Sequence, residues 1–196
     1  MKRILGLVAV VILLAVGYFY FDWQRKATLL AGAKEVEEAT YTKDGKVANI
    51  RYVGIIDAPL DKVQDTVWAV ERSSQMIENI KKSELTKQEG NTKTMLMQLK
   101  AGNLPLQQYT MEFTYHPEQH RIDFKSLQAQ AADLEGSYSL EAVGTKTRIT
   151  YAAKSTDKIA VPFPDGVIET ANREVFVNMV RGIGKALNPG QQPPAG

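Results

Sequence analysis

The chain has 196 residues, of which 44% are hydrophobic and 23% charged, and its formal net charge is +2. This length suits one domain with short appendages. The small net charge and the scattered Lys and Arg residues argue against nucleic-acid binding, and the lack of cysteine excludes disulfides, thiolate catalysis and Cys-ligated metal centres.

The first part of the chain is typical of a membrane anchor. Lys2 and Arg3 precede an uncharged run from Ile4 to Phe21, which as a helix would span about 27 Å, close to a bilayer core of roughly 30 Å. We therefore expect an uncleaved, single-pass signal-anchor over residues 1–26, followed by a linker over residues 27–35. The positions expected to lie in the membrane include Ile4, Leu7, Val11, Leu14 and Phe21.

Two questions about this segment stay open in the sequence. A cleaved signal peptide is the alternative to an anchor, because residues 31–33 read Ala-Gly-Ala, the small-residue pattern of a cleavage site. The positive-inside rule favours a cytoplasmic N-terminus because of Lys2 and Arg3. The domain would then lie on the periplasmic or extracytoplasmic side.

Residues 36–188 have the pattern of one α+β domain. A strand hairpin over residues 35–56 turns at Lys43-Asp44-Gly45, and two short helices follow between Asp57 and Asn79. From Ile80 to Lys154 strand-like segments alternate with tight turns. Residues 108–115 alternate cleanly, with Tyr, Met and Phe against Thr and Glu, which predicts a strand with one buried face.

The last predicted element is a long helix over residues 165–187. One of its sides is broad and apolar, with Asn172 as the single polar intruder, so it must be buried against something wide. Asp165 is placed to cap it. We expect this helix to cover the hidden face of a curved antiparallel sheet of about six or seven strands, and residues 189–196, rich in Pro, Gly and Gln, to be disordered.

The side chains expected between sheet and helix are rich in methionine and aromatic rings. Such residues suit an adaptable apolar pocket, although regular spacing of this kind is more often typical of plain core packing. The candidate ligand-contacting residues are Met95, Met97, Tyr109, Met111, Phe113, Phe124, Tyr138, Val175, Met179 and Gly182.

The sequence carries no recognisable catalytic or metal-binding motif. The two histidines, His116 and His120, flank Pro117 in an expected turn, where solvated side chains are the simpler interpretation. A catalytic triad would have to recruit one of them. We therefore expect no catalytic residue, no metal site and no cofactor.

Several stretches resemble, in their order and spacing, the START-like or SRPBCC superfamily, which includes polyketide cyclase/dehydrase-type and lipid-transfer domains. These stretches are VGIIDAPLDKVQDTVW at residues 53–68, MIENIKKSEL at 76–85, LEGSYSL at 134–140, GTKTRITY at 144–151, and the Val161-Pro162 step before the last helix. The resemblance covers roughly residues 36–187. It implies a helix-grip fold with an apolar cavity covered by the last helix, in a superfamily whose members bind lipids, sterols, quinones or polyketides and are only in part enzymes.

Three functions remain open from the sequence. The first is membrane-tethered binding of a hydrophobic ligand, such as a lipid, quinone, isoprenoid or polyketide-like molecule, without catalysis. The second is an aromatase/cyclase-type enzyme that uses the same cavity. The third is a tethered interaction domain whose core is filled by side chains. The expected partners are a hydrophobic small molecule or lipid and the membrane, with no nucleic acid; the oligomeric state is open.

Overall fold

The computed structural model describes residues 20–102, 104–160 and 162–189, and the chain divides into two units, Met1–Ala33 and Lys34–Gly196. In the first unit, residues 20–31 are helical. The expected membrane positions from Ile4 to Leu14 lie outside the described residues, as does the end of the chain from residue 190. Phe21 lies in the helix with 75% of its surface exposed.

No helix within the described part of the chain combines the length and apolar character that a membrane crossing requires.

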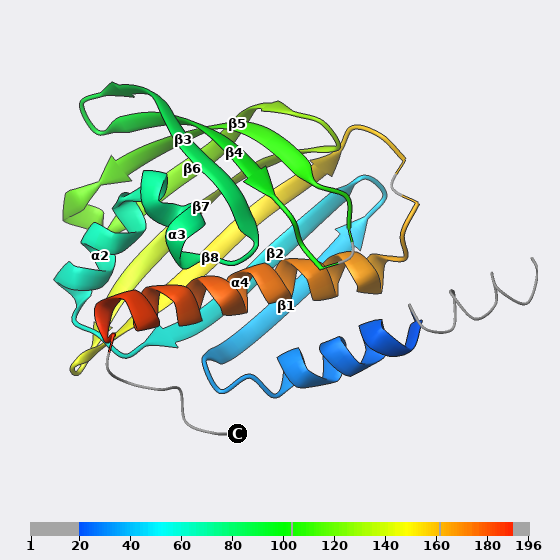
Figure 1. Ribbon diagram of the computed structural model, residues 1–196, viewed down its shortest axis with the longest axis horizontal. Coiled ribbons are helices and arrows are strands. Elements are labelled where there is room, and N and C mark those ends of the chain that lie inside the picture. Colours follow the sequence, from blue (N-terminus) through cyan, green and yellow to red (C-terminus); the bar gives the residue numbers. More distant parts are fainter. Residues whose placement is uncertain (1–19, 103, 161, 190–196) are drawn as a thin grey trace, which may run out of the picture. The chain divides into compact units, whose positions relative to one another are not determined.

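The second unit is built on one antiparallel sheet of eight strands (Figure 1). Their order across the sheet is β1-β2-β8-β7-β6-β5-β4-β3. The sequence suggested about six or seven strands; the sheet is larger because the first hairpin continues it through pairing of β2 with β8. The strands are β1 (Val36–Asp44), β2 (Val47–Ile56), β3 (Ile80–Glu89), β4 (Thr92–Leu99), β5 (Gln107–His116), β6 (Arg121–Ala129), β7 (Ala132–Val143) and β8 (Lys146–Asp157).

The helices of this unit lie on one face of the sheet (Figure 1). The predicted α+β, helix-grip architecture is confirmed, with the long C-terminal helix α4 lying across the sheet. The helical elements are α2 (Leu60–Trp68), η1 (Val70–Arg72), α3 (Ser73–Met76), η2 (Pro117–Gln119) and α4 (Asp165–Leu187).

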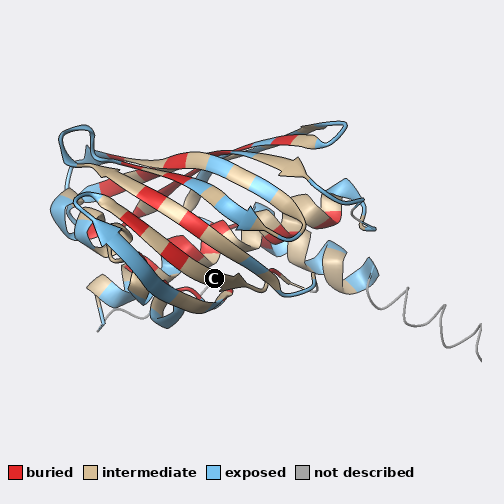
Figure 2. Ribbon diagram, turned by 90° about the horizontal axis from the view of Figure 1, so that it is seen from above, coloured by how far each residue is buried: buried red, intermediate tan, exposed pale blue. Residues whose placement is uncertain are grey.

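Alternation along the strands builds the buried face of the sheet, and Figure 2 shows buried and exposed residues alternating. In the β7–β8 pair, Tyr138 lies opposite Tyr151 and Leu140 opposite Ile149. Because side chains at every second position share a face, these pairs stack side by side toward α4. This face of the hairpin is therefore the one directed at the helix.

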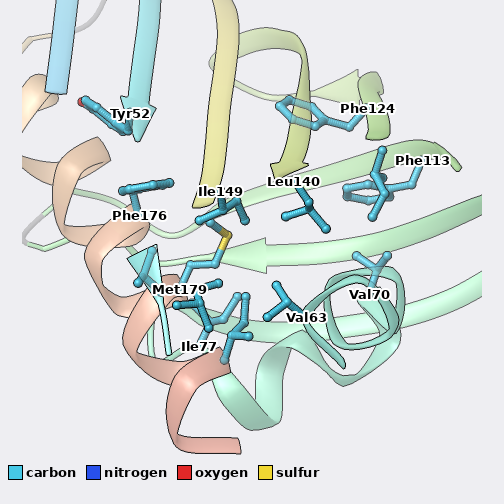
Figure 3. Packing of buried hydrophobic residues seen from close by; sticks show 14 of the residues in the cluster. Tyr52, Val63, Val70, Ile77, Phe113, Phe124, Leu140, Ile149, Phe176 and Met179 are labelled. Carbon is cyan, nitrogen blue, oxygen red and sulfur yellow. The ribbon is translucent and has the colours of Figure 1, made fainter. Parts of the chain in front are cut away.

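The apolar side of α4 completes the core. Phe176, Met179 and Ile183 are all buried, and Figure 3 shows Phe176 and Met179 projecting from α4 toward Tyr52 and Ile149 of the sheet. The Tyr52 and Phe176 ring centroids lie 5.5 Å apart. Burying each such side chain contributes roughly 1.5–3 kcal/mol, so packing against the sheet holds the helix in place.

Polar contacts fix the N-terminal end of α4. Lys43 Nζ lies 3.0 Å from Asp157 Oδ2 and 3.0 Å from Asp165 Oδ1. The expected capping role of Asp165 is wrong, because Pro164 occupies the N-cap position without a side-chain cap and Asp165 is the first helical residue. Hydrogen bonds from Lys43 to both carboxylates raise the pKa of the Lys43 ammonium, so the side chain stays charged at neutral pH and holds the start of the helix beside β8.

A buried asparagine fixes the middle of α4. The Asn79 side chain donates from Nδ2 to Glu174 Oε1 and to the Lys100 carbonyl, both at 3.1 Å. It also accepts at Oδ1 from Asn178 Nδ2 at 2.7 Å. One side chain therefore ties two turns of the helix to the start of β3 and to the segment after β4.

Gly182 lets the C-terminal half of α4 approach α3 closely. A Cβ atom at this position would lie 2.0 Å from the carbonyl oxygen of Met76. No side chain fits there, so the glycine sets the distance between the two helices.

Candidate functional site

A cavity lies between the concave face of the sheet and α4. Its volume is about 160 Å³. Side chains from β3 to β8 form its walls, and one side of α4 closes it. The lining residues are Ile80, Met97, Gln98, Leu99, Tyr109, Met111, Phe113, Phe124, Ala132, Leu134, Tyr138, Tyr151, Ser155, Asn172, Val175, Phe176 and Met179.

Aromatic rings from three strands and α4 form one wall of this cavity. The rings of Phe124 and Tyr151 are stacked, with centroids 5.6 Å apart and an interplanar angle of 9°. Tyr138 is tilted against both, at 5.2 Å from Phe124 and 5.4 Å from Tyr151. Phe176 extends the group from α4, with its centroid 6.3 Å from that of Tyr151. The wall is a continuous π surface suited to contact with another flat ring.

Gly136 makes this arrangement possible. It lies on β7 directly opposite Phe124 of β6 and Ala153 of β8. A Cβ atom there would lie 2.9 Å from Phe124 Cζ and 2.2 Å from the Ala152 carbonyl oxygen. Because the position has no side chain, the Phe124 ring can extend across β7 and stack on Tyr151.

Methionines separate this cavity from a smaller one. The second cavity has a volume of about 50 Å³ and extends toward α2 and α3. Both cavities are lined by Ile80, Met97, Phe113, Tyr138 and Met179. Methionine side chains are unbranched and change rotamer easily, so rotation of Met97 or Met179 would connect the two spaces.

The polar groups of the lining are uncharged. They comprise three tyrosines, Gln98, Ser155 and Asn172, and the described lining includes no Asp, Glu, Lys, Arg or His. Burial raises the pKa of the Tyr109, Tyr138 and Tyr151 hydroxyls above their ordinary value of 10. These hydroxyls are therefore protonated at neutral pH and can donate hydrogen bonds, but they are poor bases.

The two histidines lie away from the cavity. His116 Nε2 is 3.1 Å from Asp123 Oδ2, and His120 Nδ1 is 2.5 Å from Gln64 Oε1. Neither histidine belongs to the lining. Within residues 20–102, 104–160 and 162–189 no group of three or more His, Cys, Asp or Glu side chains is arranged to hold a metal ion.

The structure brings together most of the residues chosen from the sequence. Met97, Tyr109, Met111, Phe113, Phe124, Tyr138, Val175 and Met179 all line the cavity. Met95 is buried in the core without lining it, and Gly182 packs on Met76 instead. Ligand contact by any of them stays a prediction.

Sequence reasoning missed two rings of the aromatic wall. Tyr151 and Phe176 line the cavity, although alternation on β8 and the helical period of α4 had already placed them on the inward faces. Their periodicity was the signal that could have identified them. Asn172, the polar residue on the apolar side of α4, also lines the cavity, and its Nδ2 donates to the Ile168 carbonyl at 2.9 Å.

Comparison with known families gives a match over most of the domain. The family model described as polyketide cyclase / dehydrase and lipid transport matches residues 56–183. That range begins at the last residue of β2 and ends within α4, so it includes every residue that lines the cavity. Among curated protein sequences, none matches this chain.

Solved structures share the fold at low sequence identity. The Zhui aromatase/cyclase from Streptomyces sp. R1128 is 13% identical with a TM-score of 0.62, covering 74% of this chain and 99% of its own. A START superfamily protein from Mycobacterium smegmatis is 11% identical with a TM-score of 0.60, covering 73% and 99%. A STAR-related lipid transfer protein from Xanthomonas axonopodis is 13% identical with a TM-score of 0.58, covering 76% and 98%. At these identities the likeness establishes the fold alone.

Proposed function

This chain belongs to the polyketide cyclase/dehydrase and lipid-transport family, and from that premise we propose that it binds an apolar ligand in the cavity between its sheet and α4. The observation that carries the proposal is the cavity itself. A domain core is normally packed without voids larger than a water molecule, whereas this one retains about 160 Å³ bounded mainly by methionine, aromatic and aliphatic side chains.

The lining provides the driving force for binding. Transfer of apolar surface from water is favourable by about 25 cal/mol per Å², and a ligand in the cavity would contact mainly apolar atoms. The rings of Phe124 and Tyr151 offer a flat surface, and the methionines opposite can adjust to the ligand outline. Binding by desolvation and shape requires no catalytic group.

The size of the cavity limits the ligand. Drug-sized ligands occupy pockets of roughly 300–1,000 Å³, and an apolar cavity of roughly 150 Å³ holds benzene. At about 160 Å³ the larger cavity suits a molecule of one or two rings. A longer ligand would have to displace Met97 or Met179 and enter the second cavity.

Native mass spectrometry of the delipidated full-length chain tests the proposal, together with titration by the uncharged apolar dye Nile red. The four fused rings of this dye exceed the larger cavity, so the dye reports on a ligand that also enters the second cavity. Wild-type protein should enhance the dye fluorescence and carry bound ligand after exposure to a lipid extract. Val175→Phe places a ring in the cavity from α4 and should abolish both signals. Val143→Phe, the same change at an exposed position of β7, should preserve them. Equal binding by wild type and Val175→Phe would contradict the proposal.

Aromatase/cyclase catalysis in the same cavity has weaker support. General acid–base catalysis requires a group that exchanges protons near the working pH. The described lining offers tyrosine hydroxyls with raised pKa values and no carboxylate, imidazole or amine. Binding without turnover therefore agrees better with the groups present.

Tethering to a membrane is part of the proposal. Its support is the uncharged run from Ile4 to Phe21, with Lys2 and Arg3 before it. The ligand-binding domain would lie on the extracytoplasmic side, close to the apolar molecules that the bilayer dissolves. Full-length protein should resist alkaline extraction from membranes, and a compartment-sensitive reporter at its C-terminus should be active outside the cytoplasm. Edman sequencing that begins after Ala33 would instead indicate a cleaved signal peptide.

A further inference from the structure

Three tyrosine hydroxyls in the cavity lack a hydrogen-bond partner in the part of the chain that the structure describes. Tyr109, Tyr138 and Tyr151 come from β5, β7 and β8, and none of their hydroxyls forms a hydrogen bond to another described residue. Three tyrosine hydroxyls outside the cavity are bonded: Tyr52 donates to the Glu169 carbonyl at 3.4 Å, and Tyr115 and Tyr20 accept from glutamine side chains. Tyr41 on β1 is the one described tyrosine outside the cavity whose hydroxyl is also unbonded. Three unused donors around one apolar space are unusual, because buried polar groups are nearly always paired.

These hydroxyls also remain accessible from the cavity. Among the described side chains, the fully enclosed polar atoms without a partner are Gln107 Oε1 and Arg173 Nε. The tyrosine oxygens are not among them, so the three hydroxyls border open space and are not sealed inside packed side chains. A molecule in the cavity could therefore reach them.

The other polar groups of the lining are also uncharged. The side-chain amides of Asn172 and Gln98 each donate one hydrogen bond within the protein, to the Ile168 carbonyl and to Gln108 Oε1. Ser155 adds a hydroxyl. No described lining side chain carries a charge that could pair with an ionised ligand. An unpaired charge in such a site costs several kcal/mol, so carboxylates, sulfonates and phosphates would be excluded.

We infer that the cavity selects an uncharged molecule of one or two flat rings that carries oxygen acceptors, such as a small quinone or ring ketone. The hydroxyls of Tyr109, Tyr138 and Tyr151 would donate hydrogen bonds to those oxygens. The ring wall around Phe124 would stack on the molecule, and fatty-acid anions and phospholipids would be rejected. This selection rests on the proposed ligand-binding function and adds to it a chemical class.

Equilibrium dialysis of the full-length chain with three matched probes tests this inference. The probes are 1,4-naphthoquinone, which has rings and oxygen acceptors, naphthalene, which has rings alone, and 1,4-naphthoquinone-2-sulfonate, which adds a charge. The quinone should bind about three- to thirtyfold more tightly than naphthalene, since a net hydrogen bond is worth about three- to tenfold in affinity. The sulfonate should bind at least a hundredfold more weakly than the quinone.

Variants assign the effect to the tyrosines. Tyr138→Phe and Tyr151→Phe should each weaken quinone binding about three- to tenfold and leave naphthalene binding unchanged, which also shows that the cavity is intact. Tyr41→Phe is the matched control, because Tyr41 packs against the core from β1 without lining the cavity. It should change neither affinity.

The outcomes separate this inference from the function beneath it. Equal affinity for quinone and naphthalene, or tight binding of the sulfonate, would overturn the selection by tyrosines while ligand binding stands. Nile red binding without binding of either neutral ring probe would overturn the ligand class in the same way. Absence of binding by Nile red and by all three probes would overturn the proposed function as well.

Discussion

Substitution of Gly182 by alanine tests whether α4 is positioned by backbone contact with α3. An alanine Cβ would lie 2.0 Å from the Met76 carbonyl oxygen and 2.9 Å from its carbonyl carbon. Two residues further along the same helix, a Cβ on Gly184 would have no atom within 4 Å. The two glycines therefore form a matched pair that differs in the space available.

The magnitude follows from two opposing effects. Real Cβ atoms essentially never approach closer than 3.0 Å, so Gly182→Ala must move the helix or Met76 by about 1 Å. The obstacle is backbone and cannot rotate away, which places the cost near the upper end of the 1–3 kcal/mol typical of overpacking. Alanine favours the helix by about 1 kcal/mol over glycine. The net loss for Gly182→Ala is therefore about 2 kcal/mol, whereas Gly184→Ala should stabilise by about 1 kcal/mol.

Thermal unfolding followed by far-ultraviolet circular dichroism measures both variants. For a domain of this size 1 kcal/mol corresponds to roughly 2–4 °C in Tm, so Gly182→Ala should melt about 4–8 °C below wild type and Gly184→Ala slightly above it. If Gly182→Ala proved as stable as Gly184→Ala, the close approach of α4 to α3 would be refuted.

Three further substitutions test other contacts. The Arg181 side chain lowers the pKa of Glu35 from 4.5 mainly by a hydrogen bond. The stability that Glu35→Gln removes should therefore be present at pH 7, about 0.5 kcal/mol for a partly exposed pair. In urea titrations it should be lost as the pH falls from 4.5 through the lowered pKa of Glu35, and a difference as large in strong acid as at pH 7 would contradict this. In thermal unfolding, Lys93→Met should lower the free energy of unfolding by about 2 kcal/mol, because Lys93 Nζ donates to the Trp68 carbonyl at 3.0 Å and to the Glu71 carboxylate at 2.8 Å. Lys146→Met, which removes an exposed ion pair, should change the free energy of unfolding little. Met97→Ala should connect the two cavities and destabilise the fold by about 2 kcal/mol. In dialysis this variant should then bind naphthoquinone several-fold more tightly than benzoquinone. Met95→Ala, a buried control, should destabilise the fold without changing that preference.

The sequence contained enough to predict the architecture. The alternation from Tyr109 to Tyr115 and the apolar side of residues 165–187 follow directly from the periods of strand and helix. Both elements are present in the structure, because each pattern arises from burial of one face of a strand or helix. The family resemblance then supplied the arrangement of these elements, which periodicity alone does not determine.

The cavity was harder to predict than the fold. Inward-facing methionines and rings either interlock or leave a cavity. Which of the two occurs depends on displacements no larger than one side chain, and periodicity does not report these. Gly136 illustrates the limit: its absent side chain lets Phe124 reach Tyr151, but the sequence does not state which neighbours a strand will have. Gly182 was expected beside the ligand but packs on Met76. That contact depends on the path of a short helix, which the sequence does not determine.

The order of the strands has a consequence for how a ligand enters and leaves. β1 and β3 are the two ends of the strand order, so the sheet is a trough and not a closed barrel. A barrel must break strand–strand hydrogen bonds before it can widen, whereas a trough covered by one helix can open when that helix tilts. Ligand exchange would then require movement of α4 but no break in the sheet.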